Sequence, residues 1–179
     1  MSTAVSRITV LAGEKFACIK IAGRGDFTNS VEFSLLVREL RAAGYQYFVL
    51  DLGECALLDS TFLGVLAMLA LQLSETNQDQ CEQGLELLNA NARITESLEC
   101  LGVIQLFKLR NGALETPEAL EARQHTPAKG NKEETTRACL EAHRTLMEIN
   151  SANVARFKDV TQFLAEDLKR LKAKEPQRQ

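Results

Sequence analysis

The segment from residue 47 to residue 73 passes from one apolar pattern to another within a few residues. Tyr47-Phe-Val-Leu-Asp-Leu is a short run of β-branched and aromatic residues, which is typical of a buried strand. Residues 65–73 are apolar and rich in strong helix formers, and the polar junction Asp59-Ser60-Thr61 precedes them. A strand that leads through a loop into a helix begins a βαβ unit. The segment therefore predicts an α/β fold with a largely parallel sheet.

The remainder of residues 1–112 continues this alternation. Two strands, at 8–11 and 16–22, are separated by Ala12-Gly-Glu-Lys and predict an antiparallel hairpin. Further helices and strands are expected in alternation at 30–43, 47–52, 61–73, 85–89, 93–101 and 103–109. Because crossover connections place loops at the carboxyl ends of parallel strands, the loops 23–28 and 54–61 are expected at one edge of the sheet. We predict a mixed, largely parallel sheet of four to five strands packed by helices.

The composition changes after residue 112. Residues 113–131 are expected to form a short helix, with Thr116 as its cap and Pro117 at its first position, followed by a linker. Residues 132–175 are expected to form a helical extension, either one long helix or two with a break near residues 150–153, and residues 176–179 a disordered tail. Its apolar positions form one face: Leu146, Ile149, Phe157, Val160, Leu164, Leu168 and Leu171. That face needs a partner surface, which is either the α/β domain or another subunit, and it offers a route to a homodimer through residues 140–172.

Several classes of function are disfavoured by the overall composition. The formal net charge of −3 gives no indication of nucleic-acid binding. No stretch reaches the roughly 20 apolar residues of a spanning helix, and the first residues lack the pattern of a signal peptide, so we expect no membrane insertion. The five cysteines have no CxxC spacing, which predicts reduced thiols in a cytoplasmic protein.

The junction Asp59-Ser60-Thr61 stands where a helix N-terminus is expected. The first backbone N–H groups of a helix lack partners within the helix, and a side-chain oxygen or a bound anion can satisfy them. The Ser60 hydroxyl is therefore expected either to cap the helix or to carry a phosphate that the helix start would stabilise.

The run from Asp51 to Leu66, which contains Asp59-Ser60-Thr61-Phe62-Leu63-Gly64, resembles the signature of STAS domains, the anti-sigma factor antagonist family. In that family a strand leads into Asp-Ser-(Ser/Thr)-Gly-Leu-Gly, and an anti-sigma kinase phosphorylates the first hydroxyl residue. The segment Ile21-Ala-Gly-Arg-Gly-Asp is similar to the loop Gly-Glu-Leu-Asp of the family, and residues 85–98 are similar to its fourth strand and following helix. The resemblance covers roughly residues 5–112.

The resemblance implies roles for individual residues. Ser60 matches the phospho-acceptor, with Thr61 as the second choice, and Asp59, Thr61 and Asp26 match partner-facing positions. The chain departs from the pattern at Phe62, where the family has glycine, and at Arg24, where it has an acid, so these two residues would also meet the partner. From the residues alone, Asp26 is more often a turn former or helix cap than a contact residue, and Phe62 is equally a core residue or a surface anchor.

The function implied is that of a non-enzymatic bacterial signalling protein in transcription regulation. Its partners would be an anti-sigma factor that is also a serine kinase, and a phosphatase. The alternative is a STAS scaffold that oligomerises through its C-terminal helix and is never phosphorylated. We predict no catalytic residues, no metal and no cofactor, because the only histidines are His125 and His143, and His143 is expected on a helix surface.

Overall fold

The computed structural model describes residues 6–76, 85–115, 119–125 and 129–174. Seven strands form the sheet, in the order β6-β5-β3-β2-β1-β7, with β4 paired to the end of β2. The pairs β2–β3, β2–β4, β3–β5 and β5–β6 are parallel, whereas β1 is antiparallel to both β2 and β7. The strands are β1 (Arg7–Ala12), β2 (Phe16–Gly25), β3 (Tyr47–Asp51), β4 (Cys55–Leu58), β5 (Leu85–Leu88), β6 (Lys108–Arg110) and β7 (Glu121–Arg123).

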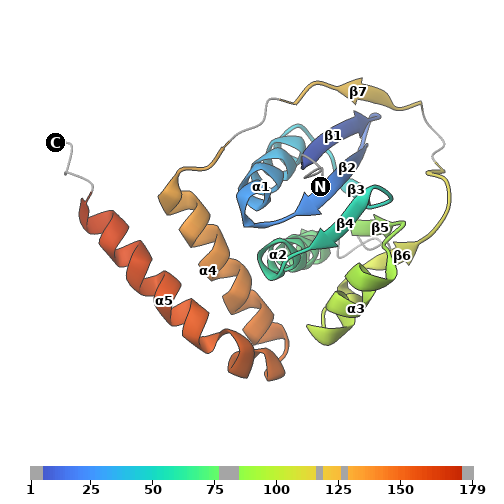
Figure 1. The fold of residues 1–179 in the computed structure, drawn as a ribbon. Coiled ribbons are helices and arrows are strands. Elements are labelled where there is room, and N and C mark those ends of the chain that lie inside the picture. The colour runs from blue at the N-terminus through green and yellow to red at the C-terminus, as the bar shows by residue number, and fades with distance from the viewer. Residues whose placement is uncertain (1–5, 77–84, 116–118, 126–128, 175–179) are drawn as a thin grey trace, which may run out of the picture.

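The helices form successive layers on one face of the sheet (Figure 1). α1 and α2 complete the core with the sheet, α4 packs on α2 and α1, and α5 packs on α4 as the outermost layer. α4 and α5 form a helical hairpin, which we call the C-terminal hairpin. The helices are α1 (Phe27–Ala42), α2 (Ser60–Thr76), α3 (Ala92–Cys100), a 3-10 turn η1 (Ile104–Leu106), α4 (Lys132–Ile149) and α5 (Ala152–Lys174).

The two faces of the sheet differ in chemistry. On one face, the side chains of alternate residues belong to the main core. Phe48 and Leu50 of β3 are examples, and both are buried there. The opposite face carries ion pairs, among them Lys20 with Asp51 at 3.7 Å. Because the helices cover only one face, the functional junction at the start of α2 lies on the covered side, between the sheet and the C-terminal hairpin.

The structure confirms the predicted mixed sheet, with an antiparallel hairpin followed by parallel crossovers. It contains more strands than expected. The loop predicted at residues 54–61 includes β4. The segment 113–131, predicted as a short helix and a linker, includes the strand β7 before the predicted linker. The strand predicted at 103–109 is the turn η1 followed by the short β6. The predictions for Thr116, Pro117 and the tail fall outside the described residues.

The C-terminal extension consists of two helices with a break between them, which is the second of the two predicted forms. α4 ends at Ile149 and α5 begins at Ala152, with Asn150 capping α5 through its side-chain oxygen, which accepts the Ala152 N–H at 3.1 Å. The apolar side of α4 packs within the chain, because Leu140 and Leu146 are buried there.

Candidate functional site

The start of α2 is positioned by the long strand β2. The first part of β2 pairs with β3, and its last residues, Gly23 to Gly25, pair with β4 after a register shift. The Asp59 N–H then donates to the Gly25 carbonyl at 2.8 Å. This brings the loop before α1 and the junction before α2 to the same edge of the sheet, as the sequence predicted.

Asp59, not Ser60, caps α2. One carboxylate oxygen of Asp59 accepts the Phe62 N–H at 2.8 Å, which is the usual bond of an N-cap residue. The other oxygen accepts the Phe27 N–H at the start of α1, at 2.9 Å. The expectation that the Ser60 hydroxyl might serve as the helix cap is therefore wrong, and Asp59 fastens the two helix starts to each other.

Asp26 caps α1 and lies near Asp59. Its carboxylate accepts the Thr28 N–H at 3.0 Å, and Asn29 completes a capping box. Burial raises the pKa of the Asp59 carboxyl, its hydrogen bonds with the Phe62 and Phe27 N–H groups lower it, and the nearby charge of Asp26 raises it further. Two carboxylates therefore flank the helix start that carries Ser60. Arg24 is exposed near the end of β2, two residues before Asp26.

Phe62 belongs to the core. Its side chain is fully buried and packs on Phe33 of α1, with ring centroids 5.1 Å apart. Gly25 makes room for it, since a Cβ at that position would lie 2.3 Å from Leu58 and 3.2 Å from the Phe62 ring. The prediction that Phe62 contacts a partner is wrong in this structure, because the large ring that replaces the glycine turns inward.

The hydroxyl of Ser60 is paired with a histidine of the C-terminal hairpin. Ser60 Oγ lies 2.9 Å from His143 Nε2, and His143 Nδ1 lies 2.7 Å from the Cys139 carbonyl oxygen. A carbonyl only accepts, so Nδ1 carries the proton of neutral His143, and Nε2 accepts the Ser60 O–H. His143 is buried and meets the Phe157 ring edge-on at 4.8 Å. The expectation of a surface histidine is wrong.

Two further residues in the first turns of α2 contact α4. The Thr61 hydroxyl donates to the Cys139 sulfur at 3.7 Å. A Cβ at Gly64 would lie only 2.6 Å from the Ala142 carbonyl oxygen, so glycine is required for this close approach. We call the contact that Ser60, Thr61 and Gly64 make with Cys139, Ala142 and His143 the α2–α4 seam.

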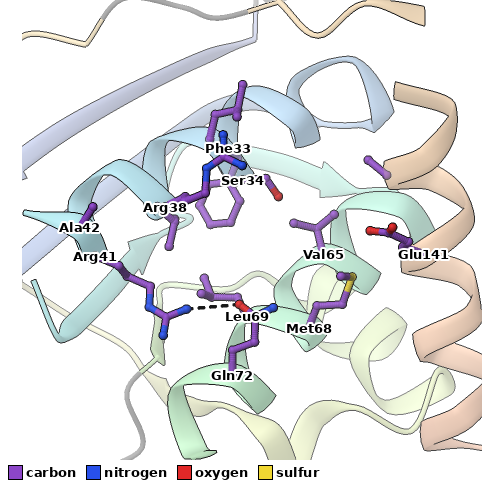
Figure 2. A pocket seen from close by; sticks show the side chains of 13 residues that line it. Phe33, Ser34, Arg38, Arg41, Ala42, Val65, Met68, Leu69, Gln72 and Glu141 are labelled. Atoms are coloured by element: carbon purple, nitrogen blue, oxygen red, sulfur yellow. Dashed lines mark hydrogen bonds between the residues drawn. The ribbon is translucent and has the colours of Figure 1, made fainter. Parts of the chain in front are cut away.

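A groove borders the seam. It encloses about 640 Å³ between α1, α2 and α4 (Figure 2). Its lining is mixed, with Val65 and Leu69 as apolar walls and the Arg41 guanidinium donating to Gln72 at 3.2 Å. Glu141 of α4 lies at the far side of the groove from Arg41 (Figure 2). The hairpin thus covers Ser60 closely but does not fill the space beside it.

The turn of the hairpin is attached separately, at the end of α3. The Asn153 side-chain amide donates to the Leu101 and Leu146 carbonyls at 2.9 and 2.8 Å. Arg156 donates to the Cys100 carbonyl at 3.2 Å. These donors satisfy carbonyl groups that a helix end leaves unpaired.

Other kinds of site find no support in the part of the chain that the structure describes. Within it, no group of three or more His, Cys, Asp or Glu residues could hold a metal ion. Within the same residues, no helix is both long and apolar enough to cross a membrane. The described cysteines, Cys18, Cys55, Cys100 and Cys139, are free thiols. The notable arrangement is therefore a serine and a threonine at a helix start, flanked by carboxylates and covered by another helix.

Comparison with protein-family models and with curated proteins gives no match. Among solved structures, a putative anti-sigma factor antagonist from Thermotoga maritima superposes on 59% of this chain and 86% of its own, with a TM-score of 0.50 and 17% identity. The fold is that of the anti-sigma factor antagonists.

Two further structures of this STAS fold align over similar lengths. An anti-sigma factor antagonist from Mycobacterium paratuberculosis has 17% identity and a TM-score of 0.47, over 58% of this chain and 84% of its own. The anti-sigma factor antagonist SpoIIAA in its unphosphorylated form has 10% identity and a TM-score of 0.49, over 59% and 88%. The superposition on the Thermotoga maritima structure leaves a large part of this chain without a counterpart.

Proposed function

We propose that the protein is a non-enzymatic regulator of the anti-sigma factor antagonist type. In this proposal it binds a protein partner at the edge that carries Ser60, and phosphorylation of Ser60 ends that binding. The partner would be an anti-sigma factor with serine kinase activity, and a phosphatase would restore the unmodified state. The process would be transcription regulation in a bacterial cytoplasm, with Asp26, Asp59, Thr61 and Arg24 beside the acceptor.

The position of the Ser60 hydroxyl carries this proposal. Because Asp59 caps α2, the hydroxyl has no task in holding the helix. It lies instead between two packed surfaces, 2.9 Å from His143. Whether this hydroxyl is free or phosphorylated would therefore decide whether a second surface can pack on it.

The charges around Ser60 determine how phosphorylation would change the binding surface. A phosphate adds about −1.5 to −2 charges and three acceptor oxygens. The start of α2 would stabilise them within the domain. Asp59 is close to the acceptor, and Asp26 is close to Asp59, so the edge would become strongly negative. A partner that packs on the neutral hydroxyl would then meet both a steric block and an unpaired charge.

The proposal is tested on protein purified from its native cells. Intact-mass measurement and peptide mapping of residues 55–75 are expected to find one phosphate on Ser60. The phosphate should be absent from Ser60→Ala and retained in Ser74→Ala, a matched exposed serine on the same helix. A phosphate retained by Ser60→Ala on Thr61 would move the site by one residue, and no phosphate under any growth condition would refute the switch.

A second candidate function is a scaffold that assembles through α5 and is not phosphorylated. The observation that favours it is the exposed apolar surface of α5, where Val160 and Phe163 lie about one turn apart and are 38 and 59% exposed. Sedimentation of Phe163→Asp against its neighbour Gln162→Asp separates the two functions. A scaffold would lose its assembly only in Phe163→Asp, whereas the regulator would keep one oligomeric state in both variants.

A further inference from the structure

We propose that the α2 face from Ser60 to Met68 is a binding surface for an amphipathic helix of the partner, and that α4 of the same chain occupies it as a competitor. The inference rests on the proposed function in one respect, since it takes the partner to dock where Ser60 lies. It adds the kind of partner element that docks there and the device that limits its access.

The shape of the surface selects a helix with a small residue at one position. Gly64 lets a facing backbone approach so closely that a Cβ at residue 64 would lie 2.6 Å from the Ala142 carbonyl and 2.7 Å from the Ala142 side chain. Only a small residue fits in the position that Ala142 occupies. This glycine is the structural mark of a helix–helix contact, and it lies one turn after Ser60.

The polar contacts add a second requirement. Ser60 donates to an imidazole nitrogen, and Thr61 donates to a sulfur at 3.7 Å. A helix bound here must therefore carry an acceptor one residue after its small residue, as His143 follows Ala142. Hydroxyl, imidazole and thiol groups can form hydrogen bonds with water when the two helices separate. This contact is therefore easier to separate than an apolar one.

The packing around the seam is incomplete. The groove of about 640 Å³ is bordered on the α2 side by Val65, Met68 and Leu69, of which Met68 is only half-buried (Figure 2). Side chains that border empty space lose the dispersion contacts of a filled core. A partner helix that also filled this groove would cover Met68 and Gln72 of α2, which are not fully buried.

Beyond the seam, the hairpin is held by the buried Leu146 of α4 and by the bonds of Asn153 and Arg156 with the end of α3. Of the 23 residues of α5, only Asn153 and Thr161 are buried. The Asn153 side-chain oxygen lies in the interior without a hydrogen-bond partner. α5 is therefore mostly exposed. Opening the hairpin removes Ala142 and Leu146 from the main core, while the contacts between the sheet, α1 and α2 remain.

The competition is tested with the full-length chain and a labelled peptide of residues 131–150, which is α4 with its caps. Ala142→Glu places a carboxylate against Gly64 and opens the hairpin without altering the α2 surface. Ala155→Glu is the matched control, because Ala155 is exposed on α5. Fluorescence anisotropy under reducing conditions measures binding of the peptide.

We expect the Ala142→Glu protein to bind the peptide at least about tenfold more tightly than the wild type or the Ala155→Glu protein. In the latter two proteins the chain's own α4 competes with the peptide at a high effective concentration. A peptide that itself carries Ala142→Glu should bind none of the three. A folded Ala142→Glu protein that does not bind the wild-type peptide, or equal binding by all three proteins, would overturn the inference.

An added Ser60→Asp substitution in the open variant separates this inference from the proposed function. Loss of peptide binding supports charge control at Ser60. Retained binding keeps the helix-binding surface and refutes that control.

Cys139 gives a second readout that needs no variant. Burial raises the pKa of the Cys139 thiol, while its hydrogen bond with Thr61 lowers it. Opening the seam exposes Cys139, whereas Cys18 stays in the sheet, where burial raises its pKa to about 11. Alkylation of the folded wild type should therefore modify Cys139 well before Cys18. Equal rates for the two thiols would mean that the hairpin opens only when the whole protein unfolds, and would overturn the competition.

Discussion

The two sides of α2 are built for different purposes. The side that carries Phe62 and Leu66 is fully buried in the apolar core shared with the sheet and α1. The side that carries Ser60, Thr61 and Gly64 meets α4 through a hydroxyl–imidazole bond, a hydroxyl–sulfur contact and a glycine. One helix thus combines a completed core with a polar, partly open seam.

The two sides of α2 therefore differ in how firmly their contacts are held. Exposing apolar side chains to water is unfavourable, so the Phe62 side stays packed once the protein folds. Hydroxyl and imidazole groups exchange protein partners for water at small net cost. We therefore expect the contacts on the α4 side to separate more readily than those on the Phe62 side.

The largest expected effect breaks the core side. Phe62→Ala should lower the free energy of unfolding by about 3–5 kcal/mol, because the substitution leaves a cavity beside Phe33. Urea denaturation measures the loss. Phe163→Ala, at a phenylalanine that is 59% exposed, should change it by less than about 0.5 kcal/mol. Similar losses in the two variants would contradict the assignment of Phe62 to the core.

A smaller effect separates the two sides. Gly64→Ala should strain the seam by about 1–3 kcal/mol, because the added Cβ meets the Ala142 backbone. Alkylation of Cys139 should then accelerate, while that of Cys18 stays unchanged. Alanine is more favourable than glycine in a helix interior by about 1 kcal/mol, so α2 itself should remain formed. An unchanged Cys139 rate would show that the seam tolerates the methyl group.

The hydrogen bond of the seam is tested by a double-mutant cycle. Ser60→Ala combined with His143→Leu should give a coupling energy of about 0.5–1.5 kcal/mol from denaturation curves. The matched cycle uses His125→Leu in place of His143→Leu. Since His125 contacts Glu32, its coupling to Ser60 should be near zero. Equal coupling in both cycles would indicate a global effect instead of a direct bond.

The smallest expected effect concerns pH. Because burial raises the pKa of Asp59, the native state binds a proton at a higher pH than the unfolded chain does. The stabilising contribution of this carboxyl is full below its unfolded pKa of about 3.9 and is lost as the pH rises through its native pKa. The stability of the wild type relative to Asp59→Asn should therefore fall from about pH 3.5 upward. A relative stability that rises over this range would reverse the assigned shift.

The elements that the sequence predicted well are those with long patterns of their own. The apolar run of α2 and the alternation from residue 16 to residue 101 led to the correct fold class. β4 was missed because its four residues, Cys55–Leu58, form a strand only by pairing with the end of β2. The expected helix from Ser30 begins at Phe27, because Asp26 with Asn29 supplies the cap.

The candidate site was predicted only in part. The pattern at residues 59–61 located the helix start, and the loop at Asp26 was expected beside it. The roles within the site were less accessible. Asp59 and Ser60 are both good capping residues, and only the bond with the Phe62 N–H assigns the cap to Asp59. Phe62 was equally consistent with core and surface until its contact with Phe33 was known.

The sequence by itself determined the parallel α/β framework, the helix start at residues 59–61 and the amphipathic extension, because each depends on residues near one another in the chain. The tertiary structure decided that α4 covers Ser60 and that His143 receives its hydroxyl. Those two residues are 83 positions apart, and no local periodicity specifies which faces of two helices meet. The fit of Gly64 against Ala142 made that choice, and it is a property of packed surfaces alone.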